Sequence, residues 1–162
     1  MGTTKNPAVA SVARQYDRTF SLLRRSVECF DAEQWMKGIS SFEVPVKVAY
    51  HTLQCLLFYF RDDPAKTFRQ VPPRFEKDWW ELDDESLPNQ SQVMTFLEEV
   101  ADLVRKYLSK LSDADLGTPF HGDTTVMENI MYAMRHTMHH QGGLNLLSVH
   151  HGIDADLWDR HG

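Results

Sequence analysis

Apolar residues recur every three or four positions in four segments of the chain, and this spacing predicts four amphipathic helices. In the third segment, charged residues fall on the side opposite the apolar stripe, which is typical of a helix at the protein surface. The four stripes comprise Tyr16, Phe20, Leu23, Val27 and Phe30; Val44, Val48, His51, Cys55 and Phe58; Val93, Leu97, Val100, Val104, Leu108 and Leu111; and Ile130, Ala133, His136, His140, Leu144 and Leu147.

Local signals support the ends of two of these helices. Pro45 suits a first helical turn, and Thr125 to Glu128 has the spacing of a capping box, with Gly152 as a stop for the last helix. Gly142 and Gly143 fall inside that helix, where each costs about 1 kcal/mol relative to alanine. Either a neighbouring helix or a ligand approaches closely there, or the helix bends.

The fold class predicted is all-α, a four-helix bundle in a single domain over residues 1–162, because no segment shows the alternation of a strand. A long connection, residues 61–90, joins the second and third helices and is long enough for them to run parallel. Phe75, Trp79 and Trp80 lie in this connection. They can form a lid over a site, a patch on the outside of the bundle, or part of a dimer interface.

Charge and composition exclude several classes of function. The formal net charge is -6 and no run of Lys or Arg exceeds two, which argues against nucleic-acid binding. No stretch of 18 apolar residues predicts a membrane span, and the N-terminal residues carry no signal core. Cys29 and Cys55 both lie in helical segments, which indicates reduced core thiols and a cytoplasmic location.

The histidines carry the candidate chemistry. His136 and His140 are four residues apart on one helix face, and His51 lies on the inward stripe of another helix, so the three can share one metal ion. Three ligands leave a tetrahedral position open, as in catalytic zinc sites. Cys55 lies four residues after His51 and is an alternative ligand or a small core residue. A core of histidines without metal is also possible, although burying three imidazoles without partners is costly.

The other histidines are assigned no ligand role. His139 points about 100° away from His140 around the helix and is expected to support the site from outside or to be exposed. His150 and His151 follow the end of the apolar stripe and are expected to be solvated, and His121 lies in a loop.

At these residues the chain resembles the DinB/YfiT-like family of metal-dependent enzymes. The resemblance covers the helix count, the long second connection and the positions of His51, His136 and His140. It implies an up-down-down-up bundle, often a homodimer, with a divalent ion at one end. Gly142 matches a glycine that is common in the family. Gly143 stands where the family commonly has a glutamine, and the neighbouring Gln141 need not take over the role of that glutamine. Characterised relatives include transferases that use low-molecular-weight thiols.

Two functional hypotheses follow. In the first, a divalent ion (zinc or nickel) and a low-molecular-weight thiol support an S-transferase that acts on a small-molecule substrate. Hydrolysis ranks lower, because no carboxylate occupies an inward position near the histidines to act as general base. In the second hypothesis, the protein binds a metal or small molecule without catalysis, and the ion joins two helices as a structural element.

Overall fold

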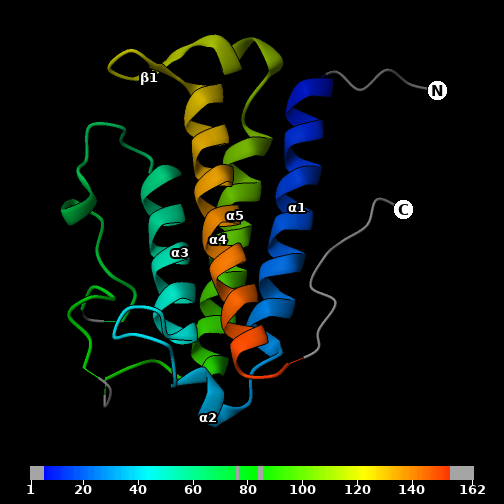
Figure 1. Cartoon of the computed structure of the whole chain (residues 1–162). Helices are drawn as coiled ribbons and strands as arrows, with labels where there is room; N and C mark the ends of the chain where they lie inside the picture. Colours follow the sequence, from blue (N-terminus) through cyan, green and yellow to red (C-terminus); the bar gives the residue numbers. More distant parts are fainter. Residues whose placement is uncertain (1–5, 76, 84–85, 154–162) are drawn as a thin grey trace.

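A computed structural model describes residues 6–75, 77–83 and 86–153 of the chain. The long helices in these ranges are α1 (Pro7–Glu28), α3 (Pro45–Tyr59), α4 (Gln90–Ser109) and α5 (Val126–His150) (Figure 1). Shorter elements are the helix α2 (Ala32–Trp35) and two turns of 3₁₀ helix, η1 (Phe68–Gln70) and η2 (Asp113–Gly117). The all-α class predicted from the sequence is confirmed.

The structure adds one small hairpin that the sequence analysis did not predict. Strand β1 (Pro119–His121) pairs antiparallel with β2 (Thr124–Thr125) just before α5. Gly122, with φ of 56°, supplies the left-handed turn residue between the strands. The strands are too short for an alternating pattern to be visible in the sequence, and they leave the all-α class unchanged.

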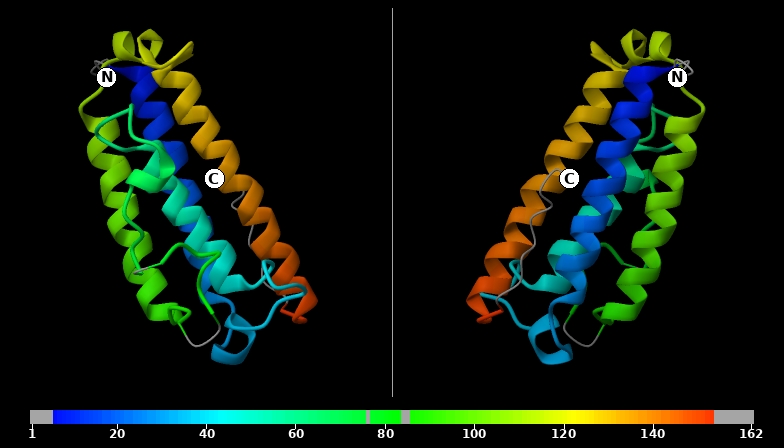
Figure 2. Two further views of the ribbon diagram at one scale, coloured as in Figure 1. Left: turned by 90° about the vertical axis from the view of Figure 1, so that its left-hand side faces the viewer. Right: turned by 90° about the vertical axis from the view of Figure 1, so that its right-hand side faces the viewer.

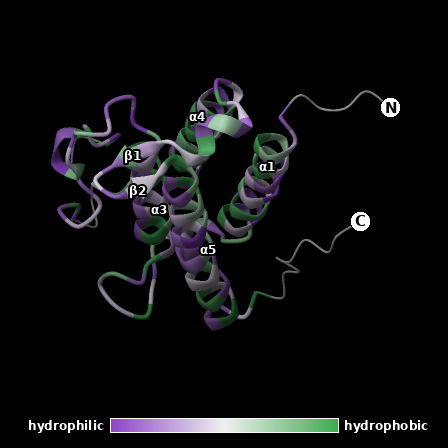
Figure 3. Ribbon diagram, turned by 90° about the horizontal axis from the view of Figure 1, so that it is seen from above, coloured by the Kyte–Doolittle hydropathy of each residue, from purple (hydrophilic) through white to green (hydrophobic). Residues whose placement is uncertain are grey.

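The four long helices form a four-sided bundle. Helix α1 packs against α4 and α5, and α3 packs against the same two helices, so that each helix has two neighbours (Figure 3). Figure 1 shows α3 and α4 running in the same direction, opposite to α1 and α5. The antiparallel pair α3 and α5 therefore lies side by side along much of its length.

Residues 60–89 carry the chain from the end of α3 back to the start of α4. This connection lies on the α3 side of the bundle, away from α1 (Figures 1 and 2). Phe75 turns inward and packs edge-on against Tyr50 and Phe96, with ring centroids 5.0 and 5.8 Å away. The connection is therefore packed against the bundle through its aromatic side chains.

Helix ends follow the rules that the sequence suggested. Pro45 occupies the first turn of α3. At α5, the Thr125 hydroxyl accepts a hydrogen bond from the Glu128 amide, and the Glu128 carboxylate accepts one from the Thr125 amide at 2.8 Å. This reciprocal pair is the predicted capping box, and it fixes where α5 begins and hence the register of its histidines. The helix ends at His150, before Gly152 with φ of 71°.

The core lies between the four helices and is closed at one end by Trp35 of α2. The indole nitrogen of Trp35 donates to the Pro88 carbonyl, and the Tyr16 hydroxyl donates to the Ile130 carbonyl at 2.7 Å. Both polar atoms are thereby satisfied inside an apolar environment. The largest fully buried side chains are Trp35, Tyr16, Tyr50, Phe20, Phe60, Phe96, Leu23, Leu53, Leu56, Leu97, Leu108 and Ile130.

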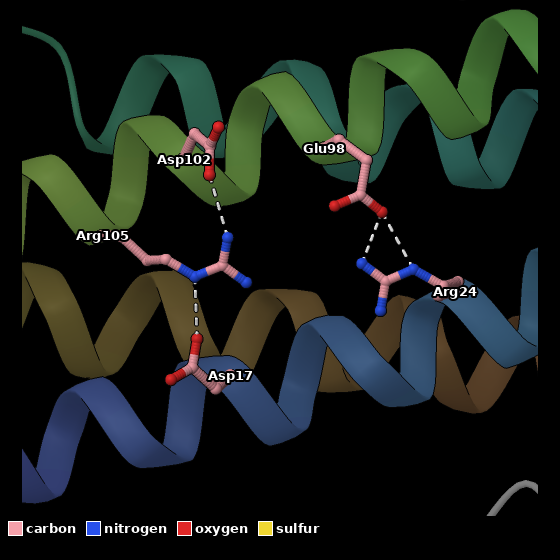
Figure 4. A network of polar contacts seen from close by, with 5 residues as sticks. All are labelled: Asp17, Arg24, Glu98, Asp102 and Arg105. Atoms are coloured by element: carbon pink, nitrogen blue, oxygen red, sulfur yellow. Dashed lines mark hydrogen bonds and ion pairs between the residues drawn. The ribbon is translucent and has the colours of Figure 1, made fainter.

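Ion pairs join the outer surfaces of α1 and α4 (Figure 4). Arg24 of α1 pairs with Glu98 of α4, and Arg105 of α4 bridges Asp17 of α1 and Asp102 of its own helix at 2.9 Å each. These groups are partly exposed, so each pair contributes only about 0–1 kcal/mol. They lie on the α1–α4 side, whereas the candidate site lies between α3 and α5.

Two further sequence predictions concern membranes and thiols. None of the helices in the described ranges combines the length and apolar character that a membrane span requires. The N-terminal segment that was expected to carry no signal core falls mostly on residues 1–5, outside the described residues. Both cysteines are free thiols, with Cys55 buried and Cys29 half-buried.

Candidate metal centre

The three predicted histidines meet between α3 and α5. The Nε2 atom of His140 lies 3.1 Å from Nε2 of His51 and 3.2 Å from Nε2 of His136. One ligand atom from each of the three residues lies within 4.8 Å of the other two. Donor nitrogens on one tetrahedral zinc ion, with bonds of about 2.0–2.1 Å, are separated by about 3.3 Å. The spacing therefore matches a group that can hold one metal ion.

The donor atoms themselves fit a cation better than a hydrogen-bonded cluster. Each Nε2 has one in-plane site, which holds either a proton or a lone pair. His140 Nε2 has two nitrogen neighbours at hydrogen-bond distance, and it can form a well-aligned hydrogen bond with only one of them. A positive ion between the three atoms would accept all three lone pairs at once.

Burial keeps these imidazoles neutral. It lowers the pKa of His51 to about 4, with a smaller contribution from the neighbouring His136. It also lowers the pKa of His140 to about 3, aided by His51, His136 and His139, and it lowers the pKa of His136. Neutral imidazole is the form that binds metal. The three side chains are therefore in the ligand form at neutral pH.

These pKa values predict how the metal-free protein responds to acid. Between pH 6.5 and about 4, His51 and His140 take up protons in the unfolded chain but not in the folded one. Unfolding is then favoured as the pH falls, so the free energy of unfolding is expected to be lower at pH 5 than at pH 7. Urea titrations with a chelator present measure this difference.

The matched control for this pH dependence is the double variant His51→Gln/His140→Gln. It removes both titrating rings but keeps polar side chains of similar size, and its stability should change less between the two pH values. An equal change in wild type and variant would show that other groups cause the pH dependence.

Cys55 contacts the site without joining the histidine group. Its Sγ lies 3.6 Å from Nδ1 of His51, and burial raises the pKa of the Cys55 thiol to about 12. The same sulfur lies 3.8 Å from Nε2 of His51, so it is nearly equidistant from the two ring nitrogens. Among the described residues, the group with metal-binding spacing contains the histidines and not Cys55.

Aromatic rings lie next to two of the three imidazoles, those of His51 and His136. The Trp79 ring lies 4.6 Å from the His51 ring, and the Tyr59 ring lies 5.5 Å from the His136 ring. Tyr132 stacks on His136 at 6.5 Å with an interplanar angle of 24°. His136 Nδ1 is buried and has no hydrogen-bond partner among the described residues, so this ring is oriented by aromatic packing. Burial raises the pKa of Tyr59, which keeps its hydroxyl protonated.

Sequence reasoning missed the two tyrosines, although their spacing held a signal. Tyr132 precedes His136 by four residues and Tyr59 follows Cys55 by four, so both continue the faces that carry the histidines. Of the three aromatic residues proposed as a lid, Trp79 covers His51. Trp80 instead packs against Phe68 and Trp79 and is 43% exposed, and Phe75 joins the core.

A cavity of about 480 Å³ opens beside the site, and His51, His140 and Trp79 are in its wall. This volume falls in the range of small-molecule pockets, about 300–1,000 Å³. Glu43 and His139 also line the cavity and are exposed. Glu43 is an exposed carboxylate on the loop before α3, so it does not overturn the expectation that no carboxylate occupies an inward position near the histidines.

Gly142 and Gly143 lie in the wall of the same cavity. A Cβ at Gly142 would have no neighbour within 4 Å, and at Gly143 it would meet only Val48 Cγ1 at 4.0 Å. The alternative that a neighbouring helix approaches closely here is therefore wrong. Helical structure continues through both positions to His150, and the glycines leave open space next to the histidines.

Several other polar residues in or just after α5 lie outside the group of three histidines. Gln141 is buried against α1, where its amide donates to Ser26 and to Asn145 Oδ1 at 3.1 Å, so it does not take a place in the site. His139 is exposed as expected. His150 is exposed, but His151 is half-buried, lies 2.8 Å from the Lys37 carbonyl through Nε2, and is not simply solvated.

Comparison with known families places the chain in one of them. The model of the DinB superfamily matches residues 15–143, which include all three histidines. The match spans most of the chain, and the chain belongs to the DinB superfamily. A comparison with curated proteins finds no match.

Proposed function

We propose that His51, His136 and His140 bind one divalent metal ion and that the protein is a metal-dependent enzyme acting on a small molecule. The observation that carries this proposal is the convergence of three histidine ligand atoms beside an open cavity, with His51 and His140 in the cavity wall. Zinc or nickel suits a set of three imidazoles. Such an ion, when bound, lowers the pKa of a thiol or water molecule at its open position.

Within this class we propose a thiol-dependent S-transferase. In the reaction, a thiol loses its proton to solvent, its sulfur forms a bond to an electrophilic carbon, and the leaving group departs with the electron pair of the broken bond. The chain's own residues would provide a half-enclosed space for both reactants. Trp79 covers one side of His51, while Glu43 and His139 lie on the exposed part of the cavity wall.

Transfer of a thiol to 1-chloro-2,4-dinitrobenzene tests this activity. At pH 7 only about 3% of an ordinary thiol is ionised, so complete ionisation raises the thiolate fraction about 30-fold, partly offset by lower nucleophilicity. We expect zinc- or nickel-loaded protein to accelerate transfer from glutathione, cysteine or 2-mercaptoethanol by about tenfold or more over metal-free protein. Rates equal to those of metal-free protein with every thiol would contradict the transferase proposal.

A structural ion is the second candidate function. His51 belongs to α3, whereas His136 and His140 belong to α5, so a bound ion would join two helices that are distant in sequence. In that case the ion would contribute to folding and have no exchangeable ligand. An unchanged visible spectrum of cobalt-loaded protein on addition of thiols would favour this role.

A further inference from the structure

The wall of the cavity next to the histidines includes a stretch of helix with two adjacent glycines. Along α5 the cavity is bounded by His139, His140, Gly142, Gly143 and Leu146. The six helical steps from His140 to Leu146 span about 9 Å, which is longer than a benzene ring. At Gly142 and Gly143 the helix presents backbone rather than side chain to the cavity, and a Cβ at Gly142 would meet nothing within 4 Å.

Packing does not require these glycines. Two glycines inside a helix cost about 1 kcal/mol each relative to alanine, and both positions have room for a methyl group. No positive φ is recorded at either residue, so backbone conformation does not require glycine either. What the two glycines do achieve is a bare surface directly beside His140.

The facing walls of the cavity are apolar. Val48 lies across from Gly143, and the Phe42 and Trp79 rings meet edge to face at 6.2 Å. Two charged residues also line the cavity, but both are engaged with the loop before α3. Lys47 donates to the Ser41 carbonyl at 3.1 Å, and Glu43 accepts from the Ser40 hydroxyl at 2.9 Å.

We propose that this part of the cavity, formed by Phe42, Val48, Trp79, Gly142, Gly143 and Leu146, is a subsite for an aromatic ring of the substrate. The ring would be attached to the group that binds at the three histidines, and the two glycines would set the depth available to it. This inference rests on the proposed metal-dependent function and specifies its substrate class. A flat apolar group fits because it can lie on the bare helix surface and be covered by the indole of Trp79.

The test compares two thiols that differ by a phenyl ring. Cobalt-loaded protein is titrated with ethanethiol and with phenylmethanethiol, and dissociation constants are taken from its visible spectrum. We expect phenylmethanethiol to bind about tenfold more tightly or better, because its ring is removed from water in the subsite. Equal dissociation constants in the wild-type protein would overturn the inference.

Substitutions at the glycines locate the effect. Gly142→Leu and Gly143→Leu should each reduce the ratio of the two dissociation constants to about one, since leucine fills the space that the ring would occupy. Gly142→Ala should keep most of the preference, because a methyl group there has no close neighbour. The matched control is Val149→Leu, on the same helix but 70% exposed and outside the cavity wall. A preference that survives both leucine variants would contradict the subsite.

A second measurement separates this inference from the metal-dependent function. In ¹H–¹⁵N spectra of metal-free protein, phenylmethanol should shift the backbone amide signals of Gly142 and Gly143, whereas ethanol should not. If the protein binds no cobalt, the proposed function fails, and this spectrum alone decides the subsite. If phenylmethanol leaves both amide signals unmoved, the subsite is wrong whatever the metal content.

Discussion

Replacing His140 with alanine is expected to lower the affinity for zinc or nickel more than any other single change. His140 is the central member of the group, with Nε2 at 3.1 Å from His51 and 3.2 Å from His136. Changing residues that merely support metal ligands costs about 10–100-fold in affinity, so the loss of a ligand should exceed about 100-fold. Competition with a chromophoric chelator gives the affinity, and mass spectrometry of the purified protein gives the metal content.

His139→Ala is the matched control for this substitution. His139 is adjacent in sequence, lies on the same helix and lines the same cavity, but it is exposed and outside the group of three. Its removal should leave metal affinity close to that of the wild type. Circular dichroism of the metal-free variants checks that the helices are retained. Stoichiometric metal in His140→Ala, or equal losses in both variants, would exclude the proposed ligand set.

The long helices could be predicted because local features of the sequence determine them. A repeat of three and four apolar positions specifies a buried face, and Pro45 and the Thr125–Glu128 box specify where α3 and α5 begin. The short helix α2 and the β1–β2 hairpin were missed because neither is long enough to show a period. Their positions depend on contacts with the long helices, such as the packing of Trp35 into the end of the core.

The candidate site likewise has a part that the sequence predicts and a part that it does not. His136 and His140 share a helix face by spacing alone, and His51 follows from the inward stripe of α3. The positions of Trp79 and Glu43 depend on how residues 60–89 and the loop before α3 lie against the bundle. The spacing of apolar residues in the sequence does not predict that arrangement. Gly142 and Gly143 show the limit of the sequence most clearly, because it indicated a special role there but not whether space or contact was the reason.

Removing the metal is expected to lower the melting temperature by a large amount. A bound ion would connect α3 with α5, and the unfolded chain does not hold the three histidines together. A ligand present at about 1,000 times its dissociation constant stabilises the folded state by about 4 kcal/mol. For a chain of 162 residues, each kcal/mol corresponds to about 2–4 °C, so chelation should lower the melting temperature by about 8–16 °C.

The same measurement on His140→Ala shows whether the effect comes from this site. A chelator should leave the melting temperature of that variant unchanged, because there is no ion to remove, whereas His139→Ala should respond like the wild type. If metal analysis shows that the ion has left the wild-type protein and its melting temperature stays the same, the ion does not join α3 to α5. A fall confined to proteins with all three histidines would show that the metal is bound between these helices. The titration of cobalt-loaded protein with thiols then decides whether it also has an exchangeable position for catalysis.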